Sequence, residues 1–344
     1  MSSDYPVTCS QARPRVILFE FKMPTHTILV LGNPAGRHFA LLDRLPGDVH
    51  VVAGETEEAF SEVVSDAQVV VIAGDHGALL RSLWPRLKQL QWVHSMWAGL
   101  ESVLFPELVA SPVVLTNGRG VFARSLSEFA LAGMLHFAKN LSRMKAQQAN
   151  ARWEAFEVEE LHGRTLGIAG YGSIGRCTAE RARAFGMRIL ALRRHPEKCA
   201  DDPLVDRAYA PQQLNDLLAA SDYILAAAPL TPETRGLIGE AAFAVMKPNA
   251  VLINLGRGPV VVEAQLVSAL RERRIRGAVL DVFDEEPLPA GHPFWSLDNV
   301  LLSPHTADHT ATWLNEAVEM FLENYRRFAA GEPLLNVTNK QAGY

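Results

Sequence analysis

The sequence predicts an α/β protein with two doubly wound parallel-sheet domains and a cleft between them. The chain has 344 residues, a length more typical of two domains than of one. Short apolar runs that end in Gly, Pro or Asn alternate with amphipathic stretches, a pattern typical of parallel sheets covered by helices. These runs fall into two series, one on each side of a long helical stretch.

The first series of apolar runs predicts a small parallel-sheet domain. Its expected strands, within residues 27–117, are TILVLG, AQVVVIAG, QWVHSM and PVVLTN. A stretch with apolar residues at helical spacing then begins near Ser125, and Ser127 and Glu128 suit a helix start. We expect one long interdomain helix here. We assign no helix or strand to residues 1–22.

The second series predicts a larger doubly wound domain. Its expected strands, within residues 164–305, are RTLGIAG, MRILAL, DYILAAAP, AVLINLG, GAVLDVF and NVLLSPH. A last helix follows, and we expect its apolar stripe to return to the first domain. The expected division is therefore residues 1–122, completed by 307–344, for the first domain and residues 123–306 for the second.

Composition points to a small-molecule ligand. The formal net charge is −5, and no basic patch or polybasic stretch suggests nucleic acid or anionic lipid. No apolar run has the length of a membrane span. The three cysteines, Cys9, Cys177 and Cys199, are too few and too scattered for a disulfide framework or a metal cluster, so we expect the reducing cytoplasm.

A glycine fingerprint in mid-chain predicts a Rossmann-like dinucleotide site. It stands between an expected strand and a helix, in the order Gly170, Tyr171, Gly172, Ser173, Ile174, Gly175. Gly170 permits the tight turn, Gly172 lets the backbone approach a pyrophosphate, and Gly175 allows close helix packing. Ser173 and Ile174 open the helix whose N-terminus faces the phosphates. The alternative is a purely structural glycine turn.

The residues after the second strand of this unit indicate which cofactor is bound. An NAD site places an acidic residue there to bind the ribose 2′-hydroxyl, whereas this chain has Arg193 and Arg194. Guanidinium groups suit a 2′-phosphate, so we expect NADPH to be preferred over NADH. The alternative is two solvated arginines at a strand end.

Four strings resemble the D-isomer-specific 2-hydroxyacid dehydrogenase family. They are PLTPETRGLIGE, MKPNAVLINLGRGPVV, GAVLDVFDEEPLP and LLSPHTA, and the resemblance covers roughly residues 65–330. It is closest in type to the glyoxylate/hydroxypyruvate reductases. Matched residue by residue, the family's carboxylate-binding arginine falls on Arg257, its acid/base on His305 and the orienting carboxylate on Glu286.

These roles agree with the chemistry of ketoacid reduction. The guanidinium of Arg257 can grip a planar carboxylate with two parallel hydrogen bonds. Hydride arriving at a carbonyl carbon leaves an alkoxide, which His305 can protonate. A carboxylate such as Glu286 on the other ring nitrogen fixes the tautomer and favours the imidazolium form. His309 is a rival histidine, expected in the first turn of the last helix.

Further positions follow from the resemblance alone. Pro229 and Thr234 are expected along the cofactor, and Asp281 at the nicotinamide carboxamide. Trp97, Ala98 and Gly99 resemble the substrate loop, whose backbone N–H groups take the substrate carboxylate; the alternative is core side chains after a strand. His305 and His309 lack a convincing third ligand, so no catalytic metal is expected.

The sequence therefore predicts an NADPH-preferring 2-ketoacid reductase, with glyoxylate and hydroxypyruvate as leading substrates. One alternative is an NAD-dependent D-2-hydroxyacid or D-3-phosphoglycerate dehydrogenase. A second, from another class, is a nucleotide-sensing corepressor or scaffold on the same fold. The resemblance also implies a homodimer that associates through the long helix near Ser125.

Overall fold

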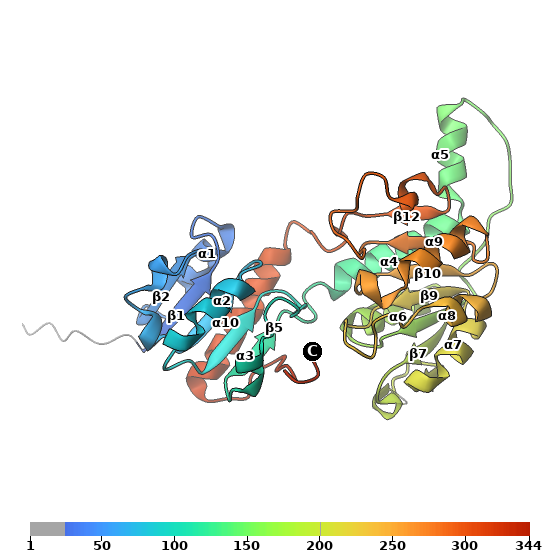
Figure 1. Cartoon of the computed structure of the whole chain (residues 1–344). Helices are drawn as coiled ribbons and strands as arrows, with labels where there is room; N and C mark the ends of the chain where they lie inside the picture. Colours follow the sequence, from blue (N-terminus) through green and yellow to red (C-terminus); the bar gives the residue numbers. More distant parts are fainter. Residues whose placement is uncertain (1–24, 200) are drawn as a thin grey trace, which may run out of the picture.

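A computed structural model describes residues 25–199 and 201–344, and it contains two parallel β-sheets with helices on both faces of each (Figure 1). This confirms the predicted α/β class. We call each sheet with its packed helices the first and the second body. Cys9 and residues 1–22 lie outside the described part of the chain. No helix in the described part is long and apolar enough to cross a membrane.

The first sheet has five parallel strands in the order β2-β1-β3-β4-β5. Four of them were expected, whereas β2 was missed. The strands are β1 His26–Leu31, β2 Val49–Gly54, β3 Val69–Ile72, β4 Trp92–Ser95 and β5 Val114–Asn117. Because the strands are parallel, the loops that follow them lie at one edge of the sheet, and the order reverses between β1 and β3, where such a sheet opens a crevice.

Two layers of helices cover the first sheet. Alternate residues of β1 point to opposite faces, so Leu29 and Leu31 pack with α2 (Gly77–Leu83) and α3 (Pro106–Ala110). Ile28 and Val30 pack on the other face with α1 (Arg37–Leu41) and α10 (Trp313–Ala330). On that face Trp92 stacks on Phe321 of α10, with ring centroids 5.4 Å apart. The last helix thus covers strands that lie far away in the sequence.

The second sheet has seven parallel strands in the order β12-β11-β10-β9-β6-β7-β8, and its order reverses between β6 and β9. Ligands bind at such a reversal, beyond the carboxyl ends of the strands. Six strands were expected and the short β8 was missed. The strands are β6 Thr165–Ala169, β7 Arg188–Leu192, β8 Arg207–Tyr209, β9 Tyr223–Ala226, β10 Val251–Asn254, β11 Gly277–Leu280 and β12 Val300–Leu302.

Helices also cover both faces of the second sheet. One face packs on α4 (Ala123–Ala138) and α6 (Ser173–Ala184), and the other on α7 (Leu214–Ala220), α8 (Glu240–Val245) and α9 (Glu263–Arg271). Gly133 lets α4 lie close to β11, because a Cβ at Gly133 would stand 2.7 Å from a methyl group of Val279. Helix α6 begins at Ser173, just after β6, so its N-terminus lies at the reversal point of the sheet.

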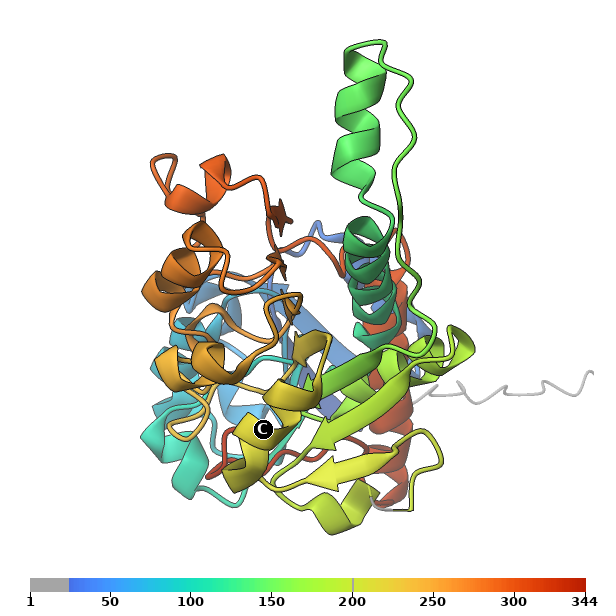
Figure 2. The same cartoon turned by 90° about the vertical axis from the view of Figure 1, so that its right-hand side faces the viewer.

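The expected long interdomain helix is two helices, so that prediction was wrong. The first, α4, begins at Ala123 rather than near Ser125 and ends before Asn140, whose φ of 52° lies in the left-handed region. Asn adopts this conformation more readily than most residues and breaks the helix. The second, α5 (Leu141–Ala149), projects away from the second body (Figures 1 and 2).

The chain crosses between the two bodies twice, before α4 and before α10 (Figure 1). Aromatic rings gather at these crossings. Trp97 stacks on Trp313 with ring centroids 4.7 Å apart and on Phe122 with centroids 5.7 Å apart. The domain boundaries at 122/123 and 306/307 stay a prediction, which limited proteolysis of the two crossings would test.

Candidate active site

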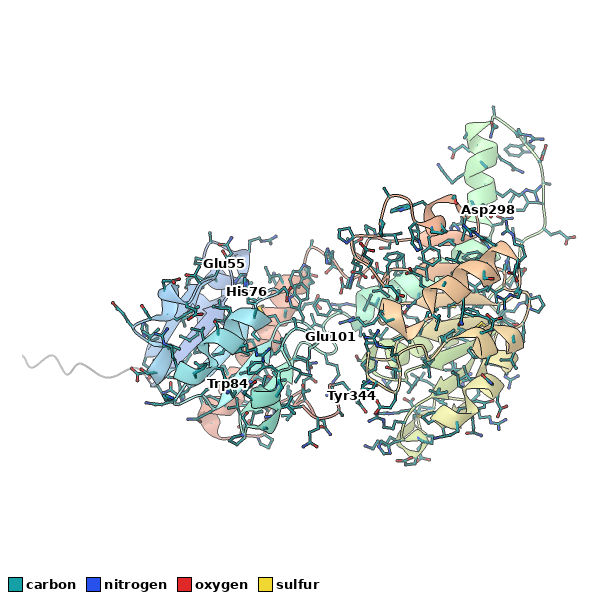
Figure 3. The ribbon with its side chains drawn as sticks, in the orientation of Figure 1. Glu55, His76, Trp84, Glu101, Asp298 and Tyr344 are labelled. Carbon is teal, nitrogen blue, oxygen red and sulfur yellow. The ribbon has the colours of Figure 1, made fainter. Side chains whose placement is uncertain are left out.

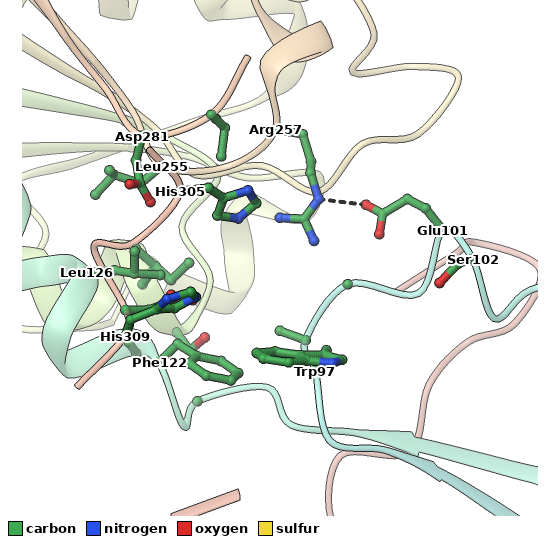
Figure 4. A pocket seen from close by; sticks show the side chains of 18 of the residues that line it. Trp97, Glu101, Ser102, Phe122, Leu126, Leu255, Arg257, Asp281, His305 and His309 are labelled. Carbon is green, nitrogen blue, oxygen red and sulfur yellow. Dashed lines mark hydrogen bonds and ion pairs between the residues drawn. The ribbon is translucent and has the colours of Figure 1, made fainter. Parts of the chain in front are cut away.

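A cavity of about 610 Å³ lies between the two bodies, and residues of both line it (Figure 4). Its lining comes from loops at the carboxyl ends of the strands. The first body contributes Gly74, Asp75, Trp97, Ala98, Gly99, Glu101 and Ser102. The second body contributes Ser173, Ile174, Leu255, Arg257, Asp281, Val282 and His305, and the two crossings contribute residues such as Phe122, Asp308 and His309.

The glycine loop fits a dinucleotide. Gly170 has a φ of 107°, and a Cβ there would collide with the backbone of Ala228. Gly175 packs tightly, because a Cβ would stand 2.8 Å from the Gly170 carbonyl oxygen, whereas Gly172 faces open space. Since α6 begins at Ser173, which lines the cavity with Ile174, backbone N–H groups are available to a pyrophosphate.

A polar network anchors this loop from behind. The buried Tyr171 donates its hydroxyl to Oδ2 of Asp202 at 3.1 Å, and Nε of Arg176 donates to the same oxygen at 2.8 Å. Burial raises the pKa of the Tyr171 hydroxyl, which therefore stays protonated and keeps donating. Burial works against the Asp202 carboxylate, but hydrogen bonds from Leu204, Arg176 and Tyr171 hold its pKa below its usual range.

Arg193 and Arg194 directly follow β7, at the position where the 2′-substituent of a bound cofactor is recognised. Within residues 25–199 and 201–344, the guanidinium of Arg193 has no hydrogen-bond or ion-pair partner. Arg194 lies 3.4 Å from Glu233 and 5.4 Å from the ring centroid of Tyr344. Arg193 is thus the better candidate for binding a phosphate.

His305 and Glu286 form a hydrogen-bonded pair in the second body, and His305 lines the cavity. Nδ1 of His305 lies 2.7 Å from Oε2 of Glu286, while Oε1 of Glu286 accepts the backbone N–H of Phe283 at 2.9 Å. This leaves Nε2 of His305 for another partner. His305 has a φ of 53°, an unusual value for a residue other than glycine, of the kind that functional sites retain.

Asp281 shapes the turn that carries His305. Its side chain is buried, and Oδ1 accepts the backbone N–H groups of Thr306 at 3.0 Å and Ala307 at 3.2 Å. Burial raises the pKa of Asp281, although the hydrogen bonds that it accepts oppose this shift. Asp281 lines the cavity, and its predicted contact with the nicotinamide stays a prediction.

Arg257 lies across the cavity from the first body (Figure 4). It follows β10, and its Nη1 donates to the carbonyl oxygen of Gly256 at 2.8 Å. Its Nε donates to Oε1 of Glu101, a residue of the first body, at 2.9 Å. Glu101 was not predicted from the sequence, because nothing in its local pattern shows that it faces Arg257.

The loop of Trp97, Ala98 and Gly99 lines the cavity opposite Arg257. Asn117 fixes the loop by donating to the Ala98 carbonyl oxygen at 2.7 Å. The backbone N–H groups of Ala98 and Gly99 have no acceptor among the described residues, and Ala98 is exposed while Gly99 is partly buried. They are available to an anionic ligand.

Two other predicted positions lie together in a turn, and His309 lies elsewhere than expected. Thr234 accepts the N–H of Thr231 at 2.8 Å and donates to the carbonyl oxygen of Pro229 at 2.6 Å, so it closes a turn after β9. Neither Pro229 nor Thr234 lines the cavity, and their contact with the cofactor stays a prediction. His309 lies in the crossing before α10, not in its first turn as expected. No group of three metal-ligating side chains occurs in the described part of the chain.

The doubly wound sheet, its glycine loop and this cavity define a nicotinamide-dependent oxidoreductase. Comparison with known proteins supports this class. Residues 131–307 match the model of the family described as D-isomer specific 2-hydroxyacid dehydrogenase, NAD binding domain. The chain is 36% identical over 262 residues to a glyoxylate reductase of Aeropyrum pernix, an alignment that covers 74% of this chain and 77% of the relative. The chain belongs to the D-isomer specific 2-hydroxyacid dehydrogenase family.

A second relative and two solved structures extend the comparison. The chain is 32% identical to a D-3-phosphoglycerate dehydrogenase of Methanocaldococcus jannaschii over 85% of its length, but this covers only 56% of that relative. An NADPH-dependent glyoxylate/hydroxypyruvate reductase of Sinorhizobium meliloti, solved with NADP and sulfate, gives a TM-score of 0.80 at 27% identity and 93% and 100% coverage. A Xanthobacter autotrophicus family member with NADPH and MES gives 0.79 at 28% identity and 93% and 99% coverage.

Proposed function

We propose that this oxidoreductase is an NADPH-preferring 2-ketoacid reductase, with glyoxylate or hydroxypyruvate as substrate. The observation that carries the proposal is one cavity lined by the guanidinium of Arg257, by the N-terminus of α6 and by His305, which is hydrogen-bonded to Glu286. The similarity of the chain to glyoxylate reductases supports the same class of substrate.

The proposed mechanism assigns one task to each group. The bound reduced nicotinamide supplies a hydride for the carbonyl carbon. Arg257 and the N–H groups of Ala98 and Gly99 bind the substrate carboxylate and turn the carbonyl toward His305. Nε2 of His305 then protonates the alkoxide oxygen, while Glu286 stabilises the imidazolium form. Approach of the two bodies excludes water and strengthens these electrostatic contacts.

Charge in the cavity favours a substrate with a single negative charge. Among the described residues that line it, Arg257 is the only lysine or arginine, whereas four lining residues are acidic: Asp75, Glu101, Asp281 and Asp308. A phosphorylated ketoacid carries at least one further negative charge and needs more cations than this lining offers. Short unphosphorylated ketoacids therefore fit better than the substrate of a D-3-phosphoglycerate dehydrogenase, which remains the second candidate through its sequence similarity.

A substrate panel tests the proposal. We expect NADPH-dependent turnover of glyoxylate and hydroxypyruvate, and a loss of kcat/KM of at least about a hundredfold in Arg257→Lys, because an ammonium cannot reproduce the bidentate fork. Absence of turnover with every 2-ketoacid would favour a nucleotide-sensing scaffold. Normal kcat/KM in Arg257→Ala would mean that the carboxylate anchor lies elsewhere.

The cofactor preference has its own test. A guanidinium near the 2′-phosphate forms charge-assisted hydrogen bonds that NADH cannot offer, so we expect NADPH to be preferred by roughly tenfold to a few hundredfold in kcat/KM. Arg193→Asp should erase or reverse this preference, and high salt should weaken it. A wild-type enzyme that favours NADH would contradict the assignment.

We also propose a homodimer that associates through α4 and α5. Helix α5 and the chain after it project from the second body (Figure 2). Leu141, Met144 and Trp153 of this segment are exposed to solvent. Burying such side chains against a second copy would stabilise both. Light scattering should give twice the mass of the chain, and Met144→Glu should lower it. A wild-type monomer at micromolar concentration would overturn the proposal.

A further inference from the structure

Glu101 is a carboxylate that already binds the arginine proposed to bind substrate. It belongs to the first body and reaches across the cavity to Arg257 of the second body, with Oε1 and Nε 2.9 Å apart (Figures 3 and 4). About half of the Glu101 side chain and a third of the Arg257 side chain are exposed. The pair therefore sits where a ligand entering the cavity meets it.

The donors of Arg257 are few once this pair has formed. A guanidinium has five N–H bonds, and a carboxylate binds it best through two parallel ones on one edge. Nη1 already donates to the Gly256 carbonyl oxygen, and Nε donates to Glu101. Nη2 points at Gly99, where an added Cβ would collide with it. A substrate carboxylate that takes the edge formed by Nε and Nη2 must therefore displace Glu101.

The charge of Glu101 acts on the remainder of the substrate as well. Once displaced from Nε, its carboxylate remains on the same short loop as Ala98 and Gly99, the predicted carboxylate-binding residues. Asp75 and Asp308 line the same cavity, so acidic side chains outnumber basic ones in its lining. A second negative charge on a substrate would be repelled, because like charges a few ångströms apart interact strongly at a partly desolvated site.

We propose that Glu101 determines specificity in two ways: it competes with the substrate carboxylate for Arg257, and it repels ketoacids that carry a second negative charge. This inference rests on the proposed role of Arg257 as carboxylate anchor. If Glu101 competes with the substrate, removing its charge should strengthen substrate binding. If Glu101 instead holds Arg257 in a productive position, removing its charge should weaken substrate binding.

Replacing Glu101 by Gln separates these tasks. Without the competing charge, KM for hydroxypyruvate should fall by about two- to fivefold, the range that a partly exposed ion pair can supply. The inhibition constant of 3-phosphohydroxypyruvate, measured against hydroxypyruvate, should fall by a larger factor. Calorimetric titration of oxamate into the enzyme saturated with NADPH should show tighter binding. Glu101→Ala should shift all three values in the same direction.

Glu62→Gln is the matched control, because it removes the same charge at an exposed site outside the cavity lining. It should leave the selectivity between the two ketoacids at the wild-type value. A rise in KM together with weaker oxamate binding in both Glu101 variants would overturn the inference and make Glu101 a positioning residue. Loss of turnover in Arg257→Ala would at the same time uphold the proposed function, whereas normal turnover there would remove the basis of both proposals.

Discussion

At the scale of single residues, the backbone of His305 makes a direct test of the proposed proton donor practicable. Its φ of 53° is one that Asn also adopts readily, so His305→Asn should preserve the turn while removing the titrating ring. We expect kcat for glyoxylate reduction to fall by roughly a hundredfold or more, as the loss of a general acid does. NADPH binding, measured by calorimetry, should stay near the wild-type value. Unchanged turnover would exclude His305 as the proton donor.

Gly99 provides a second residue-scale prediction, because it leaves space for the guanidinium. A Cβ at Gly99 would collide with Nη2 of Arg257 and stand 2.6 Å from Oε2 of Glu101. Both atoms are ends of flexible side chains, so Gly99→Ala should fold with a melting temperature near that of the wild type. The displaced guanidinium should lower kcat/KM for the ketoacid by about tenfold or more, since small errors of alignment are costly.

Gly47→Ala is the control for that substitution, because a Cβ at Gly47 meets no atom within 4 Å. It should change neither kcat/KM nor the melting temperature measurably. If Gly99→Ala has wild-type kcat/KM as well, the guanidinium does not need its observed position, and the substrate carboxylate is bound in another way.

At the scale of elements, the turn after β12 depends on Asp281. Asp281→Ala removes the acceptor of two backbone N–H groups and should lower the free energy of unfolding by about 1–3 kcal/mol, with a loss of kcat because His305 moves. The substitution Asp281→Asn, by contrast, keeps an acceptor oxygen and removes the charge.

The carboxyl of Asp281 also links stability to pH. Because burial raises the pKa of Asp281, the folded state favours the protonated form, and stability is lost as pH rises through that pKa.

Urea unfolding at pH 7 checks this expectation. Asp281→Asn should be at least as stable as the wild type there, since it avoids burying a carboxylate, whereas Asp281→Ala should be less stable. If Ala and Asn have the same stability, the two hydrogen bonds do not hold the turn.

The sequence predicted ten of the twelve strands, and those it missed are explained by their surroundings. β2 and β8 lie at sheet edges, where each pairs with a single neighbour. β8 has three residues, which begin with the exposed Arg207, so it does not form an apolar run as β12 does. β2 is only partly buried, so its sequence is less constrained than that of a central strand. The break at Asn140 was missed because the apolar spacing continues on both sides of a residue that leaves the helix.

Some residues of the candidate site could be predicted from the sequence, and others could not. The glycine loop was predicted from its own pattern, whereas Arg257, Glu286 and His305 were predicted from strings that resemble those of the family. Glu101 and Asp308 could not be found in this way. Their proximity to the cavity depends on how the two bodies face each other, which no local spacing encodes. Thr234 carries a family pattern, yet its hydroxyl is engaged in closing a turn.

At the scale of the whole molecule, His94 links stability to pH. Its ring is completely buried in β4 beside Phe321 of α10, and burial lowers its pKa to about 3. The folded-state pKa lies below 6.5, the ordinary value of a histidine. The stability that the neutral ring contributes is therefore present above pH 6.5 and is lost as pH falls toward 3. His94→Gln should therefore reduce the dependence of the unfolding free energy on pH between these limits by up to about 1.4 kcal/mol per unit.

Urea unfolding at several pH values measures this dependence. The exposed His50 supplies the control, since His50→Gln should leave the slope between pH 6 and 4 unchanged. An equal slope in the wild type and His94→Gln would mean that His94 is protonated without unfolding and that the acid sensitivity has another origin.

The packing of α10 on the first sheet also has a consequence for synthesis. The strands it covers are complete once residue 95 has been made, whereas α10 begins at Trp313. At roughly 5–20 residues per second, the apolar face of Ile28, Val71 and Trp92 waits on the order of ten seconds to a minute for its cover. All strands of the second sheet emerge during that interval. The second body can thus fold on the ribosome while the first body, which is made earlier, still exposes this apolar face to chaperones.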